Sequence, residues 1–256
     1  MRTMKNLQRA EGFTLVEIIL ALFIGGVLMS AIYIVMISGQ KSSVGVERKV
    51  AAQQDVRAGL EIMAMEIGMA SYNPFVAPGI WLQGPSVPPD VSKDCILTGN
   101  QTYKGIQEAK PASITAEMDI GSDGFGNGSI AGAEQNEVIR YAYDAAKQYI
   151  TRSTNCGTAQ PFLGADAATA AAGTRTVKVT NSTAGINNGA GVATIFRYYN
   201  SSGTELYPGT TPADIPNIRR VDITLAVETE EKDPSTNQYR QMIYSTSVLV
   251  RNHAIN

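Results

Sequence analysis

The chain has 256 residues, enough for one sizeable domain with its own hydrophobic core. Its formal net charge of −2 argues against nucleic-acid binding through a basic face. The single histidine, His253, lies near the C-terminus, where we expect a surface position, so a catalytic triad elsewhere has no candidate base. Since GxSxG and P-loop motifs are also absent from the sequence, we expect no enzymatic activity and no small-molecule substrate.

The N-terminal region combines a basic leader with a long apolar run. The leader contains Arg2, Lys5 and Arg9, and the run extends from Phe13 to Ser38. A run of this length can cross a bilayer as a helix and contact membrane lipid. The positive-inside rule places the leader in the cytoplasm, so the rest of the chain would lie beyond the inner membrane as a periplasmic domain.

Glu17 is the one charged residue inside the apolar run. Inserting a charge into a bilayer costs roughly 2.5–3.5 kcal/mol, so a retained charge usually has a partner. Cleavage after Gly12 would make Phe13 a new amino terminus, which is cationic near neutral pH. Glu17 of one subunit could then pair with the Phe13 amine of the next. Such a head-to-tail contact builds an open filament when the rotation between subunits does not close.

Two simpler interpretations of this segment explain less. A secretory signal peptide has an apolar region of only about 7–15 residues, and Met29-Ser30-Ala31 is a poor cleavage site. A plain signal anchor explains the length of the run but gives no role to Glu17.

The sequence Gly12-Phe13-Thr14-Leu15-Val16-Glu17 resembles the prepilin-peptidase signature of type IV pilins and type II secretion pseudopilins. The resemblance implies cleavage after Gly12 and N-methylation of Phe13, with residues 1–12 removed as a leader. It also implies that Glu17 sets the register between subunits. The assembly segment of the mature chain would then be residues 13–38.

Residues 39–73 are predicted to continue the helix with an amphipathic pattern that packs on a globular head. The apolar positions at helical spacing are Val46, Val50, Val56, Leu60, Met63 and Ile67. With the span, the helix would be about 60 residues, or ~90 Å, long. Glycines weaken helix interiors, so Gly25, Gly26, Gly39 and Gly45 are candidate bends. Asn73-Pro74 is predicted to end the helix because a residue before proline avoids the helical region.

Residues 74–256 are predicted to form a β-rich head. Strands are expected at 113–118, 137–143, 148–153, 174–180 and 192–200, with loops at 74–112, 157–173 and 205–217. The clearest strands, 221–227 and 242–250, alternate apolar and polar residues, which indicates an antiparallel sheet with one buried face. The predicted fold class is therefore α+β, with one long helix packed on an antiparallel sheet.

Two groups of head residues are candidates for further bonds. Cys95 and Cys156 are predicted to form a disulfide in an oxidising compartment, contributing roughly 4 kcal/mol, with two buried free thiols as the alternative. Asp119, Asp123 and Asn127 offer oxygen ligands of the kind that calcium takes. Since the loop lacks the other ligands of an EF-type site, we favour a solvated turn and expect no cofactor.

Segments of the head also resemble PilW-type minor pilins, a group that overlaps the J-type pseudopilins of type II secretion. The resembling segments are Met65–Pro74, where Ser71 departs from a common glycine, Asp119–Gly124, Ile218–Ile223 and Ser247–Asn252. The resemblance implies a minor pilin that helps to initiate type IV pilus assembly at the filament tip. The alternatives are a J-type minor pseudopilin and a membrane-anchored periplasmic adhesin or enzyme.

The implied partners are prepilin peptidase, other minor and major pilins, the inner-membrane assembly platform and a tip adhesin. The implied location is the bacterial inner membrane, followed by the pilus at the cell surface.

Overall fold

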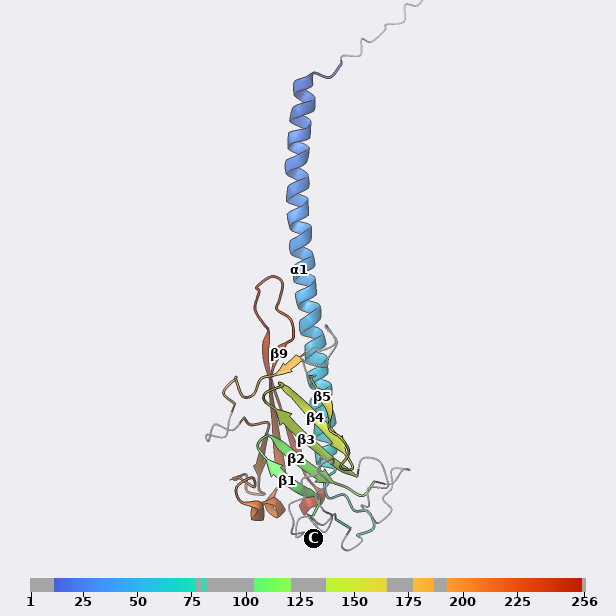
Figure 1. The fold of residues 1–256 in the computed structure, drawn as a ribbon, viewed down its shortest axis with the longest axis vertical. Coiled ribbons are helices and arrows are strands. Elements are labelled where there is room, and N and C mark those ends of the chain that lie inside the picture. The colour runs from blue at the N-terminus through green and yellow to red at the C-terminus, as the bar shows by residue number, and fades with distance from the viewer. Residues whose placement is uncertain are drawn as a thin grey trace, which may run out of the picture.

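A computed structural model describes residues 12–76, 80–81, 104–120, 137–164, 177–186 and 193–254. One long helix, α1 (Leu15–Gly68), is followed by two antiparallel sheets that form the head, as Figure 1 shows. The α+β class predicted from the sequence is therefore confirmed. The first sheet has the strand order β1-β2-β3-β4-β5, and the second has the order β10-β9-β7-β8, with β6 also paired to β9.

The strands of the first sheet are β1 (Ile106–Lys110), β2 (Ser113–Glu117), β3 (Val138–Asp144), β4 (Tyr149–Thr154) and β5 (Gln160–Leu163). Those of the second are β6 (Val177–Val179), β7 (Phe196–Tyr199), β8 (Glu205–Leu206), β9 (Arg220–Thr229) and β10 (Gln241–Leu249). Two short 3-10 helices, η1 (Pro212–Asn217) and η2 (Asn252–Ala254), flank the last two strands.

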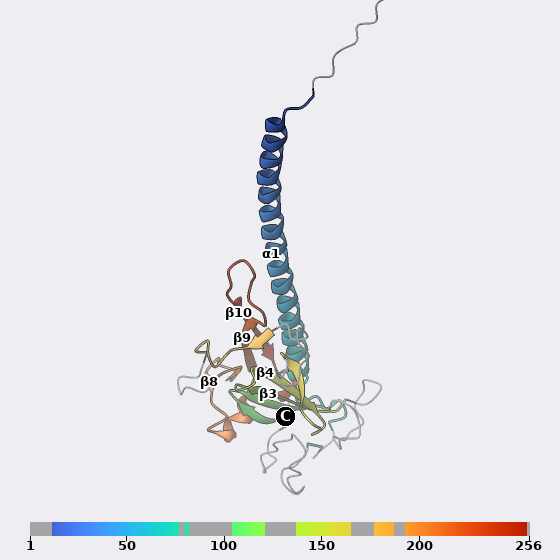
Figure 2. The ribbon, with the colours of Figure 1, turned by 45° about the horizontal axis from the view of Figure 1, so that its top comes forward.

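The helix has 54 residues, which corresponds to ~81 Å at 1.5 Å per residue. It is continuous through all four glycines that the sequence marked as candidate bends. Its buried residues all lie in the C-terminal part and follow helical spacing: Gly45, Ala52, Val56, Gly59, Leu60, Met63 and Ile67. The N-terminal half extends away from the head in both ribbon views (Figures 1 and 2).

The buried stripe of α1 differs from the predicted one at its upper end. Val46 and Val50 are 59% and 43% exposed, so the prediction that they face the head was wrong. At this level the helix is contacted through Gly45, where a Cβ atom would lie only 3.1 Å from the carboxylate of Asp233. The hairpin between β9 and β10 therefore packs against the helix at a glycine, where the helix presents no side chain.

The helix also ends earlier than predicted, at Gly68 rather than at Asn73-Pro74. The N–H of Met69 still bonds to the carbonyl of Met65, at 3.2 Å, and the backbone then turns. Ser71 adopts a left-handed conformation with φ 65°, and its N–H donates to the carbonyl of Glu117 on β2 at 2.8 Å. A bond to the sheet thus ends the helix before the proline can.

Most predicted strands are present, but three short ones lie in segments that were predicted as loops. β1 was missed because a bulge between Ile106 and Glu108 interrupts its alternation. β5 was missed because it contains Pro161, which is compatible only with an edge strand or a bulge. β8 and η1 lie in the predicted loop 205–217, where no period is long enough to be recognised.

The buried half of α1 shares one hydrophobic core with both sheets. Met63 and Ile67 belong to the same cluster as Ile114 and Tyr141 of the first sheet and Leu225 of the second. Each of these five side chains is at most 1% exposed. The helix therefore supplies part of the head's own core and holds the two sheets together.

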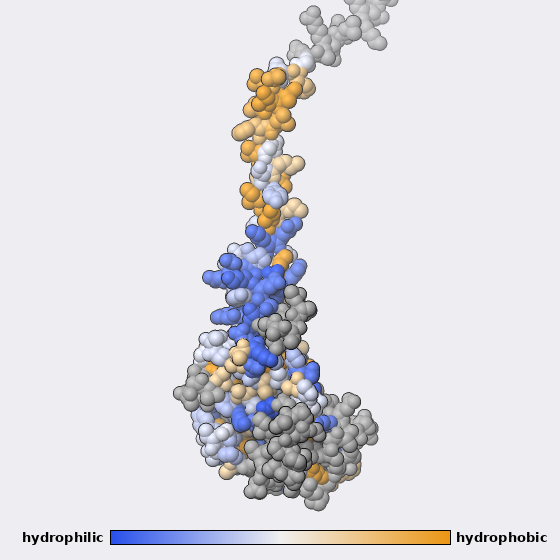
Figure 3. Space-filling model, in the orientation of Figure 1, coloured by the Kyte–Doolittle hydropathy of each residue, from blue (hydrophilic) through white to orange (hydrophobic). Residues whose placement is uncertain are grey.

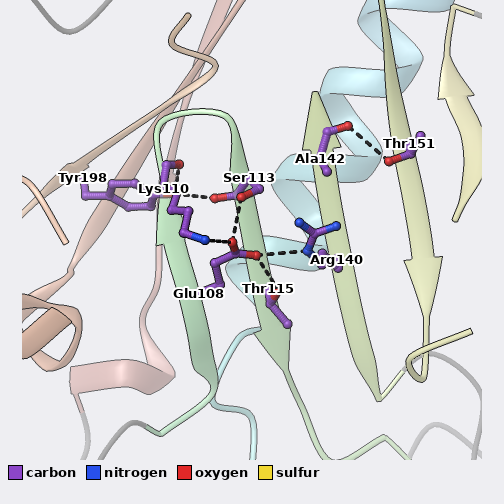
Figure 4. Close-up of polar contacts among 8 residues, drawn as sticks. All are labelled: Glu108, Lys110, Ser113, Thr115, Arg140, Ala142, Thr151 and Tyr198. Carbon is purple, nitrogen blue, oxygen red and sulfur yellow. Dashed lines mark hydrogen bonds and ion pairs between the residues drawn. The ribbon is translucent and has the colours of Figure 1, made fainter. Parts of the chain in front are cut away.

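A charged cluster links β1, β2 and β3 on the other face of the first sheet (Figure 4). Glu108 of β1 accepts bonds from Lys110 at 2.8 Å, from the Ser113 hydroxyl at 3.0 Å and from Arg140 Nε of β3 at 3.0 Å. Burial opposes ionisation of Glu108, but the bonds from Lys110 and Arg140 outweigh it and lower the pKa of this carboxyl. The Tyr198 hydroxyl donates to the Lys110 carbonyl at 2.8 Å, which joins β7 to the β1–β2 turn.

Candidate processing and assembly site

The start of α1 is fixed by a capping box between Thr14 and Glu17. Thr14 is the N-cap, and its hydroxyl oxygen accepts a bond from the Glu17 N–H at 3.3 Å. In return, Glu17 Oε2 accepts bonds from the Thr14 N–H at 2.9 Å and from the Thr14 hydroxyl at 3.0 Å. Two backbone donors that a helix start leaves unsatisfied are thereby satisfied. Glu17 thus has a structural role inside its own subunit. This role was not predicted from the sequence, although the pattern Thr-x-x-Glu is typical of a capping box.

Gly12 and Phe13 lie immediately before this cap, outside the helix. Phe13 is 85% exposed, and no other part of the described structure lies within 4 Å of where a Cβ of Gly12 would be. The bond between these two residues is therefore in accessible, non-helical backbone. Exposed, non-helical backbone of this kind is where proteolytic cleavage concentrates. The preceding residues 1–11 lie outside the described part of the chain.

The helix surface that follows Glu17 is apolar and faces away from the head. Figure 3 shows this upper half as a hydrophobic rod that becomes hydrophilic where it nears the head. Leu15, Leu22, Phe23 and Val35 are each at least 69% exposed. Among the described residues, α1 is the one helix that is long enough and apolar enough to cross a membrane. No residue of its most apolar 18-residue stretch is buried in the head. The surface is therefore suited to lipid or to the helices of other subunits.

The other predicted sites are only partly within the described residues. Asp119 is buried, and its N–H donates to the Tyr72 carbonyl at 2.8 Å, whereas Asp123 and Asn127 lie outside the described residues. The described part of the chain contains no group of three or more His, Cys, Asp or Glu side chains arranged for a metal ion. Cys156 follows β4 with φ 58°, but Cys95 lies outside the described residues, so the disulfide between them stays a prediction.

The expectation that His253 is a surface residue was wrong. It is 6% exposed, its Nδ1 lies 2.7 Å from the Ser71 hydroxyl, and its Nε2 lies 2.9 Å from the Ile215 carbonyl. The chain after β10 turns back under the end of α1, which brings this residue to Ser71. Burial lowers the pKa of His253. The pair ties together three segments far apart in sequence.

These features define the class of the protein: a long exposed apolar helix, capped by Thr14 and Glu17, that packs through its C-terminal half on antiparallel sheets. This is a pilin-like α+β fold. Residues 7–33 match the family model described as the prokaryotic N-terminal methylation motif. The chain therefore carries a prokaryotic N-terminal methylation motif of the type IV pilin and pseudopilin kind at the start of a membrane-capable helix. No curated protein and no solved structure matches the chain.

Proposed function

We propose that the protein is a minor pilin that takes part in initiating type IV pilus assembly at the filament tip. The observation that carries this proposal is the position of Glu17, whose carboxylate caps an exposed apolar helix directly after the predicted cleavage site. Prepilin peptidase would remove residues 1–12 and methylate Phe13. The mature subunit would keep residues 13–38 in the membrane, residues 39–73 as the helix that enters the head, and residues 74–256 as the periplasmic head.

In this mechanism Glu17 changes partners on assembly. In the single subunit its carboxylate is held by the N–H and hydroxyl of Thr14. In the assembly the same carboxylate pairs with the Phe13 amine of a neighbour, where exclusion of water strengthens the attraction between the two charges. Each subunit carries one group of each sign, so the contact repeats head to tail.

A minor rather than a major subunit is supported by the size of the head and by the resemblance to PilW-type minor pilins. A head built from two five-stranded sheets is bulky to repeat along a thin filament but suits a tip. The partners would be prepilin peptidase, other minor and major pilins, the inner-membrane platform and a tip adhesin. The J-type minor pseudopilin of type II secretion is the alternative, because the methylation motif is common to both groups.

Deletion of the gene tests the proposal when surface pili and secreted exoproteins are scored in the same strain. Loss of pili with intact secretion supports the minor-pilin function. Loss of secretion with intact pili assigns the chain to the pseudopilins, with Gly12, Phe13 and Glu17 in the same roles. If both processes continue at the wild-type level, neither function is correct.

A further inference from the structure

Strand β10 forms one edge of the second sheet, and in the described residues it pairs only with β9. The Thr229 N–H donates to the Arg240 carbonyl at 3.1 Å, and the Val250 N–H donates to the Arg219 carbonyl at 3.0 Å. Bonded positions alternate along an antiparallel pair, so the even-numbered residues from 240 to 250 bond to β9. The backbone groups of the odd-numbered residues, Ile243, Ser245, Ser247 and Leu249, therefore point to the outer edge.

This outer edge has no charged residue along its length. The ten residues between Arg240 and Arg251 are all uncharged. Ile243 and Leu249, which share the outward face of the strand, are 65% and 57% exposed. A long, uncharged edge of this kind readily pairs with another strand, and soluble proteins usually interrupt or charge such edges.

The other edges of the two sheets carry such interruptions. β1 has a bulge after Ile106 and bears both Glu108 and Lys110. β5 contains Pro161 beside a second register shift. β8 and β6 have two and three residues, so neither offers a long edge. The open edge of β10 is therefore a particular property of this strand and not a general property of the head.

The direction of β10 relative to α1 restricts what can pair with it. Next to the start of β10, the hairpin contacts the middle of the helix, where Arg48 Nη1 donates to the Lys232 carbonyl at 3.0 Å. At its end, Val248 approaches Gly68, where a Cβ would lie 3.4 Å from Val248 Cγ1. The strand thus runs alongside the helix and in the same direction, and Figures 1 and 2 both show the hairpin beside α1. A strand added to β10 would lie parallel to the axis of the helix.

A second copy of this chain fits the edge poorly. Antiparallel pairing of two β10 strands would point their two helices in opposite directions, which a shared membrane does not allow. In a parallel ladder, a residue whose backbone N–H and C=O point towards the partner strand lies opposite a residue whose backbone groups point away. A two-fold axis would instead place each residue of β10 opposite its own copy, with both sets of backbone groups pointing inward. Two β10 strands related in this way are therefore out of register. The interrupted edges of the other strands offer a second copy no alternative.

We propose that the outer edge of β10 binds, by β-strand addition, an uncharged extended segment from the head of a different pilin-like subunit. This inference rests on the proposed function, because a neighbour anchored by the same kind of helix presents its head on the same side of the membrane. Backbone bonds to Ile243, Ser245, Ser247 and Leu249 supply the ladder. The exposed side chains of Ile243 and Leu249 contact apolar residues of the added segment.

The test is photo-cross-linking of the full-length chain in the membrane of its own bacterium, with benzoylphenylalanine in place of Leu249. The expected adduct joins this position to a head segment of another protein that carries an N-terminal methylation motif, identified by peptide mass spectrometry. Ser245→Pro removes one outward N–H and should lower the adduct yield about tenfold. The matched control is Ser245→Ala, which keeps that N–H and should leave the yield unchanged.

Thermal unfolding of the detergent-extracted variants shows whether Ser245→Pro still folds. If it does not, Ile243→Lys serves instead, since it charges the edge without changing its backbone. An adduct between two copies of this chain, or with a protein that lacks the motif, overturns the proposal, as does a yield that neither Ser245→Pro nor Ile243→Lys lowers. If gene deletion leaves pili and secretion intact while the expected adduct forms, the proposed function fails and the strand pairing stands.

Discussion

Glu66 of α1 and Arg152 of β4 form a two-bond ion pair between the helix and the first sheet. Arg152 Nη2 lies 2.6 Å from Glu66 Oε1, and Arg152 Nε lies 3.0 Å from Oε2. The Tyr141 hydroxyl donates to the same carboxylate. Because the side chains of Glu66 and Arg152 are only 13% and 23% exposed, this contact fixes the rotation of the helix as it enters the core.

Replacing Glu66 by Gln should lower the free energy of unfolding by about 1–3 kcal/mol, since it leaves Arg152 partly buried without its counter-ion. Chemical denaturation of the detergent-extracted chain, followed by tyrosine fluorescence, measures the change. The matched control is Glu61→Gln, because Glu61 is exposed on the same helix and should change stability by no more than about 0.5 kcal/mol. Equal losses in both variants would show that helix charge, and not this pair, is responsible.

The hydrophobic contact between helix and head can be tested with two methionines that differ only in position. Met63 is fully buried in the core, whereas Met65 is 59% exposed. Met63→Ala should cost about 2–5 kcal/mol through lost burial and the cavity it leaves. Met65→Ala should stay within about 0.5 kcal/mol of the wild type. Similar unfolding midpoints for the two variants would contradict the packing direction of α1.

The sequence predicted the parts of this fold that repeat along the chain. The 3.6-residue period located Val56, Leu60, Met63 and Ile67 on the head-facing side of the helix, and the period of two located β9 and β10. It failed where one contact between distant segments decides the structure. The early helix end needs the bond from Ser71 to β2, and the burial of His253 needs the chain to return to that same serine.

The candidate site shows the same division. The identity and spacing of Gly12, Phe13 and Glu17 were readable in the sequence, and the family comparison confirms the methylation motif around them. The pattern Thr14-x-x-Glu17 also indicates the local capping bond, but the apolar surroundings of Glu17 favoured the interpretation that its partner lies in another subunit. The unpaired edge of β10 could not be predicted from the sequence, because which strands lie beside β10 depends on the arrangement of the whole sheet.

Glu108 makes the stability of the head depend on acid pH. The pKa of its carboxyl is lowered in the folded state, so its stabilisation is present above the ordinary value of 4.5 and is lost as the pH falls through the lower folded value. Unfolding midpoints measured between pH 7 and pH 3 should therefore drop below pH 4.5, and Glu108→Gln should flatten that drop. An unchanged pH profile in the variant would remove Glu108 as its cause.

His253 should add a second pH dependence of stability, at higher pH than that of Glu108. Here too stability should fall as the pH falls. Its pKa is lowered by burial, so below 6.5 the unfolded chain takes up a proton that the folded chain does not. Stability should decline from about pH 6.5 downwards until the folded pKa is reached. Comparing wild type with His253→Gln between pH 7.5 and pH 5 isolates this range from that of Glu108. If the two curves run parallel there, the histidine titrates normally and the buried pair with Ser71 is not formed in solution.

The exchange of partners proposed for Glu17 separates its charge from its capping role. Glu17→Gln keeps a side-chain oxygen that can accept from the Thr14 N–H, so the helix start is preserved while the charge is lost. Thr14→Ala removes the hydroxyl that accepts from the Glu17 N–H but keeps the carboxylate. We expect both variants to be inserted, cleaved after Gly12 and methylated on Phe13, as mass spectrometry of the mature N-terminus would show.

Piliation should then differ between these two variants. Glu17→Gln should abolish the contribution of this subunit to pilus initiation, because an amide cannot pair with the neighbour's amine as an ion. Thr14→Ala should retain it, since the carboxylate needed by the neighbour is present and is released from one of its own contacts. The measurement is the number of surface pili after the deletion strain is complemented with each variant. Normal piliation with Glu17→Gln would mean that the carboxylate serves only as a helix cap.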